Sequence, residues 1–198
     1  MMKWIVITQP DFIPGEALFI DRLFSHGLDL LHLRKPESDI RDCKRLLDKI
    51  SPEWLPKIVV HDHFELCSEY GLGGVHLNGR NPMPPQGHKG TLSRSCHSLE
   101  EIDAYMTCCD YLTLSPIFNS VSKQGYMAAF TAGQLLAAKS KGLINQKVVA
   151  LGGVTLQNIP QVKDFGFGGV AVLGDVWQRV GDADVDDYLD SLRMALQI

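Results

Sequence analysis

The sequence reads VVALGGVT at residues 148–155 and GGVAVLG at residues 168–174. Each segment joins a short, largely β-branched apolar run to glycine, which is typical of a buried parallel strand that ends in a tight turn. Glycine at such a turn lets backbone N–H groups approach a phosphate, and the following helix adds partial positive charge. The two segments therefore predict adjacent βα units with a phosphate site at Gly152, Gly153 and Gly174. The alternative is that these glycines only make tight turns.

Six similar apolar runs precede these two, with helical stretches between them. This alternation predicts repeated βα units around a parallel sheet. The eight predicted strands cover residues 4–8, 30–34, 58–61, 74–77, 91–96, 111–114, 148–151 and 169–172. We expect an α/β fold: a compact, single-domain (β/α)8 TIM barrel over residues 1–198. An open doubly wound sheet is the alternative. The barrel is favoured by the count of eight and by polar residues at the strand ends, where barrel active sites lie.

Helical periodicity is clearest over residues 39–50, with Ser38 as the expected N-cap. Similar patterns cover residues 99–106, 131–141, 156–165 and 185–196, and Gly142 is placed to end the second of these. Residues 78–90 differ because they are rich in glycine and proline. We therefore expect the helix after the fourth strand to be short or missing.

Composition excludes several classes of protein. The 198 residues are 45% hydrophobic with a formal charge of −4, so the chain should fold and has no overall basic field to attract nucleic acid. Its longest apolar runs fall far short of the roughly 20 residues that cross a bilayer. Five cysteines without CxxC spacing indicate reduced thiols in the cytoplasm. The sequence is compatible with a homo-oligomer but does not determine the oligomeric state, because interface helices and core helices share one amphipathic pattern.

The end of the second predicted strand reads LHLRK at residues 31–35. Alternation along a strand sends His32 and Arg34 to one face. If that face is the barrel interior, the Arg34 guanidinium is a fork-shaped donor suited to phosphate or pyrophosphate. The alternatives are an ion pair at the rim for Arg34 and a hydrogen-bonded core position for His32.

Other strand ends also carry polar side chains. The sixth strand runs into a hydroxyl-rich loop in which Ser120, Ser122 and Lys123 are placed to cradle an anion, unless Lys123 is only a solvated loop lysine. The third and fifth strands end in HDH at residues 61–63 and RSCH at residues 94–97. No spacing there supports zinc. A single carboxylate that shares Mg²⁺ with substrate phosphates is more reasonable.

Five segments, in this order, resemble the thiamine phosphate synthase and TenI family of barrels over nearly the whole chain. They read LHLR at 31–34, GVHL at 74–77, RSCHSLEE at 94–101, DYLTLSPIFNSVSK at 110–123 and ALGGV at 150–154. The resemblance implies a transferase that binds small phosphorylated substrates. It would condense a hydroxymethylpyrimidine pyrophosphate with a thiazole phosphate, giving thiamine phosphate and pyrophosphate.

The resemblance also implies roles for individual residues. Arg34, Ser95 and Lys123 would contact pyrophosphate, and Asp62 would help to hold Mg²⁺. The thiazole phosphate would be held by the hydroxyl and glycine positions Ser120, Ser122, Gly152, Gly153 and Gly174. His32 joins the catalytic set and His61 the substrate-binding set, as strand-end residues beside these groups.

The chain departs from the synthase pattern at several positions. His61 replaces an asparagine, Arg80-Asn81 replaces an acidic pair, and Pro36 replaces a lysine, which leaves adjacent Lys35 as the candidate substitute. One expected Mg²⁺ carboxylate is therefore absent. His32 stands where synthases have glutamine and TenI-like members have histidine.

Two alternative functions follow from these departures. A TenI-like thiazole tautomerase, an isomerase, needs one phosphate site and a general acid or base. Its histidine in the sixth-strand segment is Pro116 here, so His32 or His61 would have to transfer the proton. The other alternative is a non-catalytic barrel that binds thiazole phosphate or thiamine phosphate.

Overall fold

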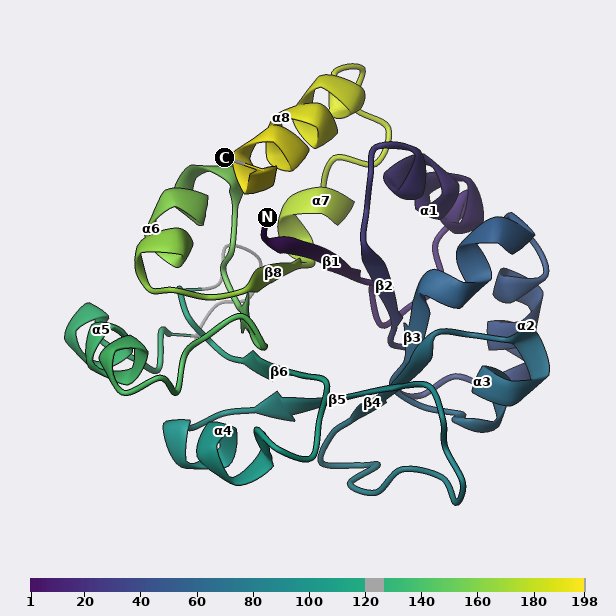
Figure 1. The fold of residues 1–198 in the computed structure, drawn as a ribbon. Helices are drawn as coiled ribbons and strands as arrows, with labels where there is room; N and C mark the ends of the chain where they lie inside the picture. Colours follow the sequence, from purple (N-terminus) through teal and green to yellow (C-terminus); the bar gives the residue numbers. More distant parts are fainter. Residues whose placement is uncertain (120–126, 198) are drawn as a thin grey trace.

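Eight parallel strands close into a barrel in the computed structural model, which describes residues 1–119 and 127–197 (Figure 1). Each strand pairs with the next in the chain, and β8 pairs with β1. The strands are β1 (Lys3–Ile7), β2 (Leu30–Leu33), β3 (Ile58–Val60), β4 (Gly74–Leu77), β5 (Thr91–Cys96), β6 (Tyr111–Leu114), β7 (Val148–Leu151) and β8 (Gly169–Val172). The predicted TIM barrel is confirmed, and the predicted bounds of β4 to β8 match those observed.

Helices surround the strands in an outer ring (Figure 1). They are α1 (Glu16–Ser25), α2 (Ile40–Leu47), α3 (Glu65–Tyr70), α4 (Leu99–Tyr105), α5 (Ala132–Ser140), α6 (Ile159–Asp164), α7 (Gly174–Trp177) and α8 (Val185–Gln197), with 3₁₀ turns η1 (Pro52–Lys57) and η2 (Leu156–Asn158). Residues 78–90, all described, contain no helix, as predicted. Within the described ranges, no helix has the length and apolar character needed to cross a bilayer.

Local hydrogen bonds set the helix ends. The predicted N-cap of α2 is wrong by one residue: the Asp39 carboxylate accepts from Arg41 N at 2.8 Å, whereas Ser38 Oγ donates to Lys35 O at 2.9 Å. Helix α2 also ends at Leu47 rather than at residue 50. Thr131 caps α5 as part of a capping box, and Gly142, with φ of 76°, follows its end as predicted.

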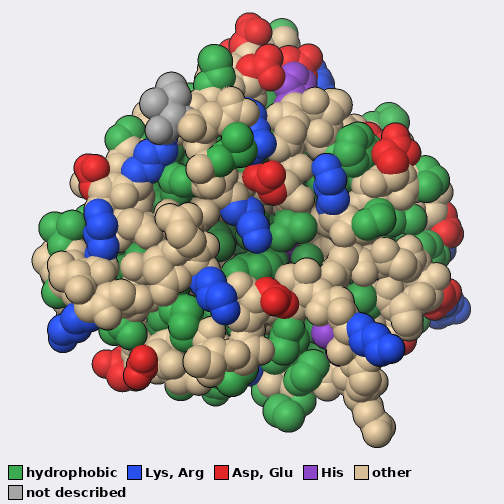
Figure 2. Space-filling view, viewed as in Figure 1, with side chains coloured by type: hydrophobic (Ala, Val, Ile, Leu, Met, Phe, Trp, Pro, Cys, Tyr) green, Lys and Arg blue, Asp and Glu red, His purple; other side chains and the backbone are tan. Residues whose placement is uncertain are grey.

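Strand residues alternate between two packing layers. Leu31 and Leu33 point outward into the large apolar core between strands and helices, while His32 points into the barrel. The interior also holds a small apolar cluster of Ile5, Ile7, Tyr111, Val149 and Ala171. In Figure 2, side chains of both charge signs are mixed over the face in view, so neither sign forms a continuous patch there.

Three buried histidines form a polar layer inside the barrel. His32 Nδ1 lies 2.9 Å from His61 Nε2, and His32 Nε2 lies 2.6 Å from Tyr111 Oη. The two ring nitrogens of His76 lie 2.8 Å from Ser93 Oγ and 2.8 Å from Ser95 Oγ. Burial lowers the pKa of His32 and of His61 well below the ordinary 6.5, and that of His76 to about 3. The layer is therefore neutral in the folded protein at pH 7.

This layer predicts how the free energy of unfolding depends on pH. The unfolded chain protonates these histidines near pH 6.5, whereas the folded chain resists protonation because its pKa values are lower. Stability should be independent of them above about pH 7 and should fall as pH drops from about 6.5 towards about 3. Each histidine contributes a slope of about 1.4 kcal/mol per pH unit.

Urea denaturation at a series of pH values measures this slope. In the variant His76→Gln, the slope of the unfolding free energy against pH should be smaller by the contribution of one histidine. Stability that does not change between about pH 7.5 and about pH 5 would contradict a neutral buried layer.

Candidate functional site

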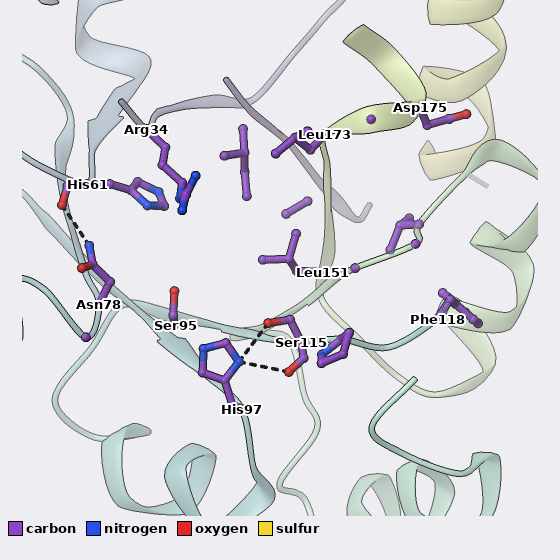
Figure 3. Close-up of a pocket in the computed structure, with 18 of the residues that line it drawn as sticks. Arg34, His61, Asn78, Ser95, His97, Ser115, Phe118, Leu151, Leu173 and Asp175 are labelled. Atoms are coloured by element: carbon purple, nitrogen blue, oxygen red, sulfur yellow. Dashed lines mark hydrogen bonds between the residues drawn. The ribbon is translucent and has the colours of Figure 1, made fainter. Parts of the chain in front are cut away.

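A cavity of about 380 Å³ lies at the C-terminal ends of the strands, among the loops that follow them (Figure 3). This volume is in the usual range for a small-molecule site. The lining residues, taken in chain order, are Ile7, Arg34, His61, Asn78, Gly79, Arg80, Ser95, His97, Ser115, Pro116, Phe118, Leu151, Gly152, Gly153, Val154, Ala171, Leu173, Gly174 and Asp175. Most predicted site residues that the structure describes therefore line one cavity.

The glycine side of the cavity is built by a close approach of two loops. Gly152 and Gly153 have φ of 95° and 64°, a region that side chains rarely adopt. A Cβ on Gly153 would lie 2.3 Å from Asn119 O. Phe118 N donates to Gly152 O at 3.0 Å, which ties the loop after β6 to the turn after β7. Glycine is thus required here by packing and by backbone conformation, and it leaves the backbone of this turn in the cavity wall.

Arg34 enters the cavity from the end of β2. Its backbone is fixed by Thr8, whose Oγ1 accepts from Arg34 N at 2.9 Å and donates to Arg34 O at 3.2 Å. Figure 3 shows the guanidinium extending from the side of His61 into the cavity, with Asp175 on the opposite side. The predicted interior orientation of Arg34 is what the structure shows.

Lys35 faces the other way. Its side chain is 1% exposed, and Nζ lies 2.7 Å from Glu16 Oε1 in a buried ion pair against α1. The expectation that Lys35 substitutes for the lysine replaced by Pro36 is therefore wrong, because Lys35, just beyond the end of β2, is held by Glu16 of α1 and does not line the cavity.

His32 and His61 occupy different positions relative to the cavity. His61 lines it, while its backbone O accepts from Asn78 Nδ2 at 2.9 Å. His32 is fully buried beneath the cavity wall, and both of its ring nitrogens have hydrogen-bond partners. Direct contact of His32 with a substrate has no support in this geometry; what His32 does is fix the ring of His61.

Asp62, the expected Mg²⁺ ligand, is already bound by side chains. Arg80 Nε donates to Asp62 Oδ1 at 3.1 Å and Arg80 Nη2 donates to Oδ2 at 3.0 Å. Asn81 Nδ2 also donates to Oδ1, at 2.9 Å. Mg²⁺ needs oxygen ligands that are free to approach to about 2.1 Å. A carboxylate whose two oxygens are held by a guanidinium does not fit this requirement.

The three interior histidines are a second set of candidate metal ligands among the described residues, since their nitrogens lie within 4.8 Å of one another. However, the His61 and His76 rings stack at 4.2 Å, and both nitrogens of His32 and of His76 have hydrogen-bond partners. This is the arrangement of a hydrogen-bonded layer rather than of an open coordination site.

The β5 and β6 ends complete the polar wall. Ser95 Oγ lies 2.8 Å from His76 Nε2 and lines the cavity, as predicted. His97 Nδ1 lies 3.2 Å from Ser115 O and 3.3 Å from Ser115 Oγ, as drawn in Figure 3. The residues Ser120, Ser122 and Lys123 lie outside the described residues.

Sequence reasoning did not assign Asn78, Arg80, His97 or Asp175 to the site, although all four line the cavity. Asn78 directly follows β4, so the strand-end rule that found Arg34 would also have found it. In the sequence, Arg80 stands out only as a departure from the synthase pattern. Nothing in its spacing shows that it turns back to meet Asp62.

Comparisons with known proteins place the chain in a family and agree with its fold. A family model described as thiamine monophosphate synthase (TMP-TENI) matches residues 5–176. A thiamine-phosphate synthase of Halalkalibacterium halodurans is 26% identical over 191 residues, covering 90% of this chain and 88% of the relative.

Solved structures extend the comparison. A thiamine phosphate pyrophosphorylase from Bacteroides thetaiotaomicron is 40% identical, with a TM-score of 0.89 over 99% of this chain and 98% of the other. A thiamine phosphate pyrophosphorylase from Pyrococcus furiosus, at 21% identity and a TM-score of 0.78 over 99% and 96%, shares the fold. With most of its length matched by one family model, the chain belongs to the thiamine monophosphate synthase (TMP-TENI) family.

Proposed function

We propose that the protein is a thiamine phosphate synthase. It joins a hydroxymethylpyrimidine pyrophosphate to a thiazole phosphate and releases pyrophosphate. One observation carries the proposal: a single cavity is lined both by the glycine turn after β7 and by Arg34 and Ser95, which bring guanidinium and hydroxyl groups from β2 and β5. Such a cavity suits two phosphorylated molecules bound side by side. The 40% identity to a thiamine phosphate pyrophosphorylase over nearly the full length of both chains supports it.

The reaction breaks the C–O bond between the pyrimidine methylene and pyrophosphate, which leaves with the electron pair. The thiazole nitrogen then forms the new bond to that methylene carbon. Negative charge develops on the departing oxygen, so preorganised cationic donors lower the barrier. Among the residues that line the cavity, Arg34 at the end of β2 supplies a guanidinium and Ser95 on β5 supplies a hydroxyl. Lys123 remains a proposed pyrophosphate contact.

The thiazole phosphate is proposed to bind on the opposite side. Gly152, Gly153 and Gly174 offer a backbone surface without side chains, on which phosphate can be held by N–H groups. Ser120 and Ser122 remain proposed hydroxyl donors to the same group. The apolar side chains of Leu151 and Leu173 also line the cavity. Apolar walls limit the access of water to a reactive cationic carbon.

The expected cytoplasmic location belongs to this proposal, and it is supported by the five cysteines, all of which are free thiols. Assembly into a homo-oligomer stays a prediction.

A coupled assay tests the proposed function. The purified protein is given both substrates with Mg²⁺ present, and thiamine phosphate and pyrophosphate are quantified together. We expect the two products in equal amounts, and we expect a carboxythiazole phosphate isomer given alone to stay unchanged. Binding of thiazole phosphate without any thiamine phosphate formed would contradict the synthase and identify a non-catalytic binder. Turnover of the isomer alone would identify a tautomerase.

The turn after β7 provides a second test. In Gly153→Ala, the added Cβ meets Asn119 O and the residue keeps an unfavourable φ, at a cost of about 1–3 kcal/mol. The KM for thiazole phosphate should rise at least about fivefold, with a smaller effect on the KM for the pyrimidine substrate.

Gly181→Ala is the matched control, because Gly181 also has a positive φ, of 96°, but its Cβ would enter open space. Equal KM values for thiazole phosphate in the two variants would show that the turn does not bind this substrate.

A further inference from the structure

We propose that Arg80 is a diphosphate-binding residue, and that the Asp62–Arg80 pair lets this cavity bind pyrophosphate without a divalent cation. The inference rests on the proposed function only for the identity of the anion. It concerns a position that the sequence marked as a departure from the synthase pattern and that the fold brings to the cavity wall.

In the Asp62–Arg80 pair, the carboxylate is largely buried and the guanidinium side chain is more exposed. The Asp62 side chain is 13% exposed and does not line the cavity, whereas the Arg80 side chain is 44% exposed and does. Two parallel hydrogen bonds join them. A guanidinium has five N–H donors, so three remain for another acceptor. Asp62 thus orients Arg80 and leaves three of its donors unused by the pair.

The backbone of Arg80 is held as firmly as its side chain. Asn78 Oδ1 accepts from Arg80 N at 2.9 Å and from Asn81 N at 3.1 Å. Asn78 Nδ2 and Asn81 Nδ2 both donate to His61 O at 2.9 Å. These bonds fix the short turn after β4 onto the end of β3, so the guanidinium is positioned before any anion arrives.

The charges around the cavity favour an anion on this side. Arg34 and Arg80 bring two guanidinium groups to the wall, and fork-shaped donors match phosphate oxygens in pairs. The acidic residue of the lining, Asp175, is bonded by Tyr188 Oη and lies 3.9 Å from Arg179. Figure 3 places Asp175 across the cavity from Arg34. Pyrophosphate between the two arginines would therefore meet little repulsion.

A divalent cation is disfavoured at the same place for a physical reason. It would have to take a carboxylate oxygen from Arg80 or Asn81 and would then lie next to a guanidinium of like charge. The guanidinium already provides the positive charge that a metal ion would bring to the leaving group.

Calorimetric titration with sodium pyrophosphate tests the inference on the full chain, once with EDTA and once with Mg²⁺. We expect binding in EDTA, with a Kd that changes less than about threefold when Mg²⁺ is added. Arg80→Gln should weaken binding in EDTA at least about tenfold, because a charge-assisted hydrogen bond is lost. Arg80→Lys keeps the charge but loses the fork-shaped pair of donors. Its Kd for pyrophosphate in EDTA should lie between those of the unchanged protein and of Arg80→Gln.

Arg41→Gln is the matched control. Arg41 pairs with Asp39 through Nε and Nη2 as Arg80 pairs with Asp62, but it does not line the cavity. It should bind pyrophosphate like the unchanged protein.

Three results would overturn the inference: pyrophosphate binding only with Mg²⁺, no binding in either condition, or equal Kd values for Arg80→Gln and Arg41→Gln. None of them decides whether thiamine phosphate is made, which the coupled assay measures separately with Mg²⁺ present.

Discussion

Closure of the barrel between β8 and β1 is the constraint on which the site depends. Gly169 pairs with Lys3, and a Cβ on Gly169 would lie 2.7 Å from Lys3 O, so glycine permits this close approach. Closure brings the C-terminal ends of all eight strands to one rim. Arg34, from the second strand, then shares a cavity with Gly174, which follows the eighth. An open sheet would separate these two ends.

The buried histidine layer determines which groups of the cavity wall are charged. Burial, and then the neighbouring histidine and arginine charges, lower the pKa of His61, so this ring is uncharged in the cavity wall at pH 7. The positive charge on that side comes from Arg34 and Arg80 instead. Guanidinium groups keep their charge across the physiological pH range, whereas an imidazole would not. Anion binding by this wall should therefore depend little on pH.

The sequence predicted the strands well because each is a short apolar run bounded by glycine or polar residues, and β4 to β8 have the predicted bounds. Alternation also placed Arg34 correctly. Pairings between distant side chains were not predictable, because spacing does not reveal which ends meet. The buried partner of Lys35 is Glu16, and the partner of Asp62 is Arg80. Helices α1 and α3 were not predicted, although the buried residues of α1, among them Ala17, Ile20 and Phe24, recur at helical spacing. The core alternative for His32 is what the structure shows, but its partners His61 and Tyr111 lie on distant strands and could not be identified from spacing.

We propose that one cavity holds a phosphate at the glycine turn and a diphosphate at the arginine wall. A crystal structure with thiamine phosphate and pyrophosphate bound tests it most directly. We expect the phosphate of thiamine phosphate to lie against the backbone of Gly152 and Gly153, and pyrophosphate to be bonded to Arg34 and Arg80 while Arg80 still holds Asp62. Pyrophosphate bound through a metal ion on Asp62, or either ligand outside this cavity, would contradict it.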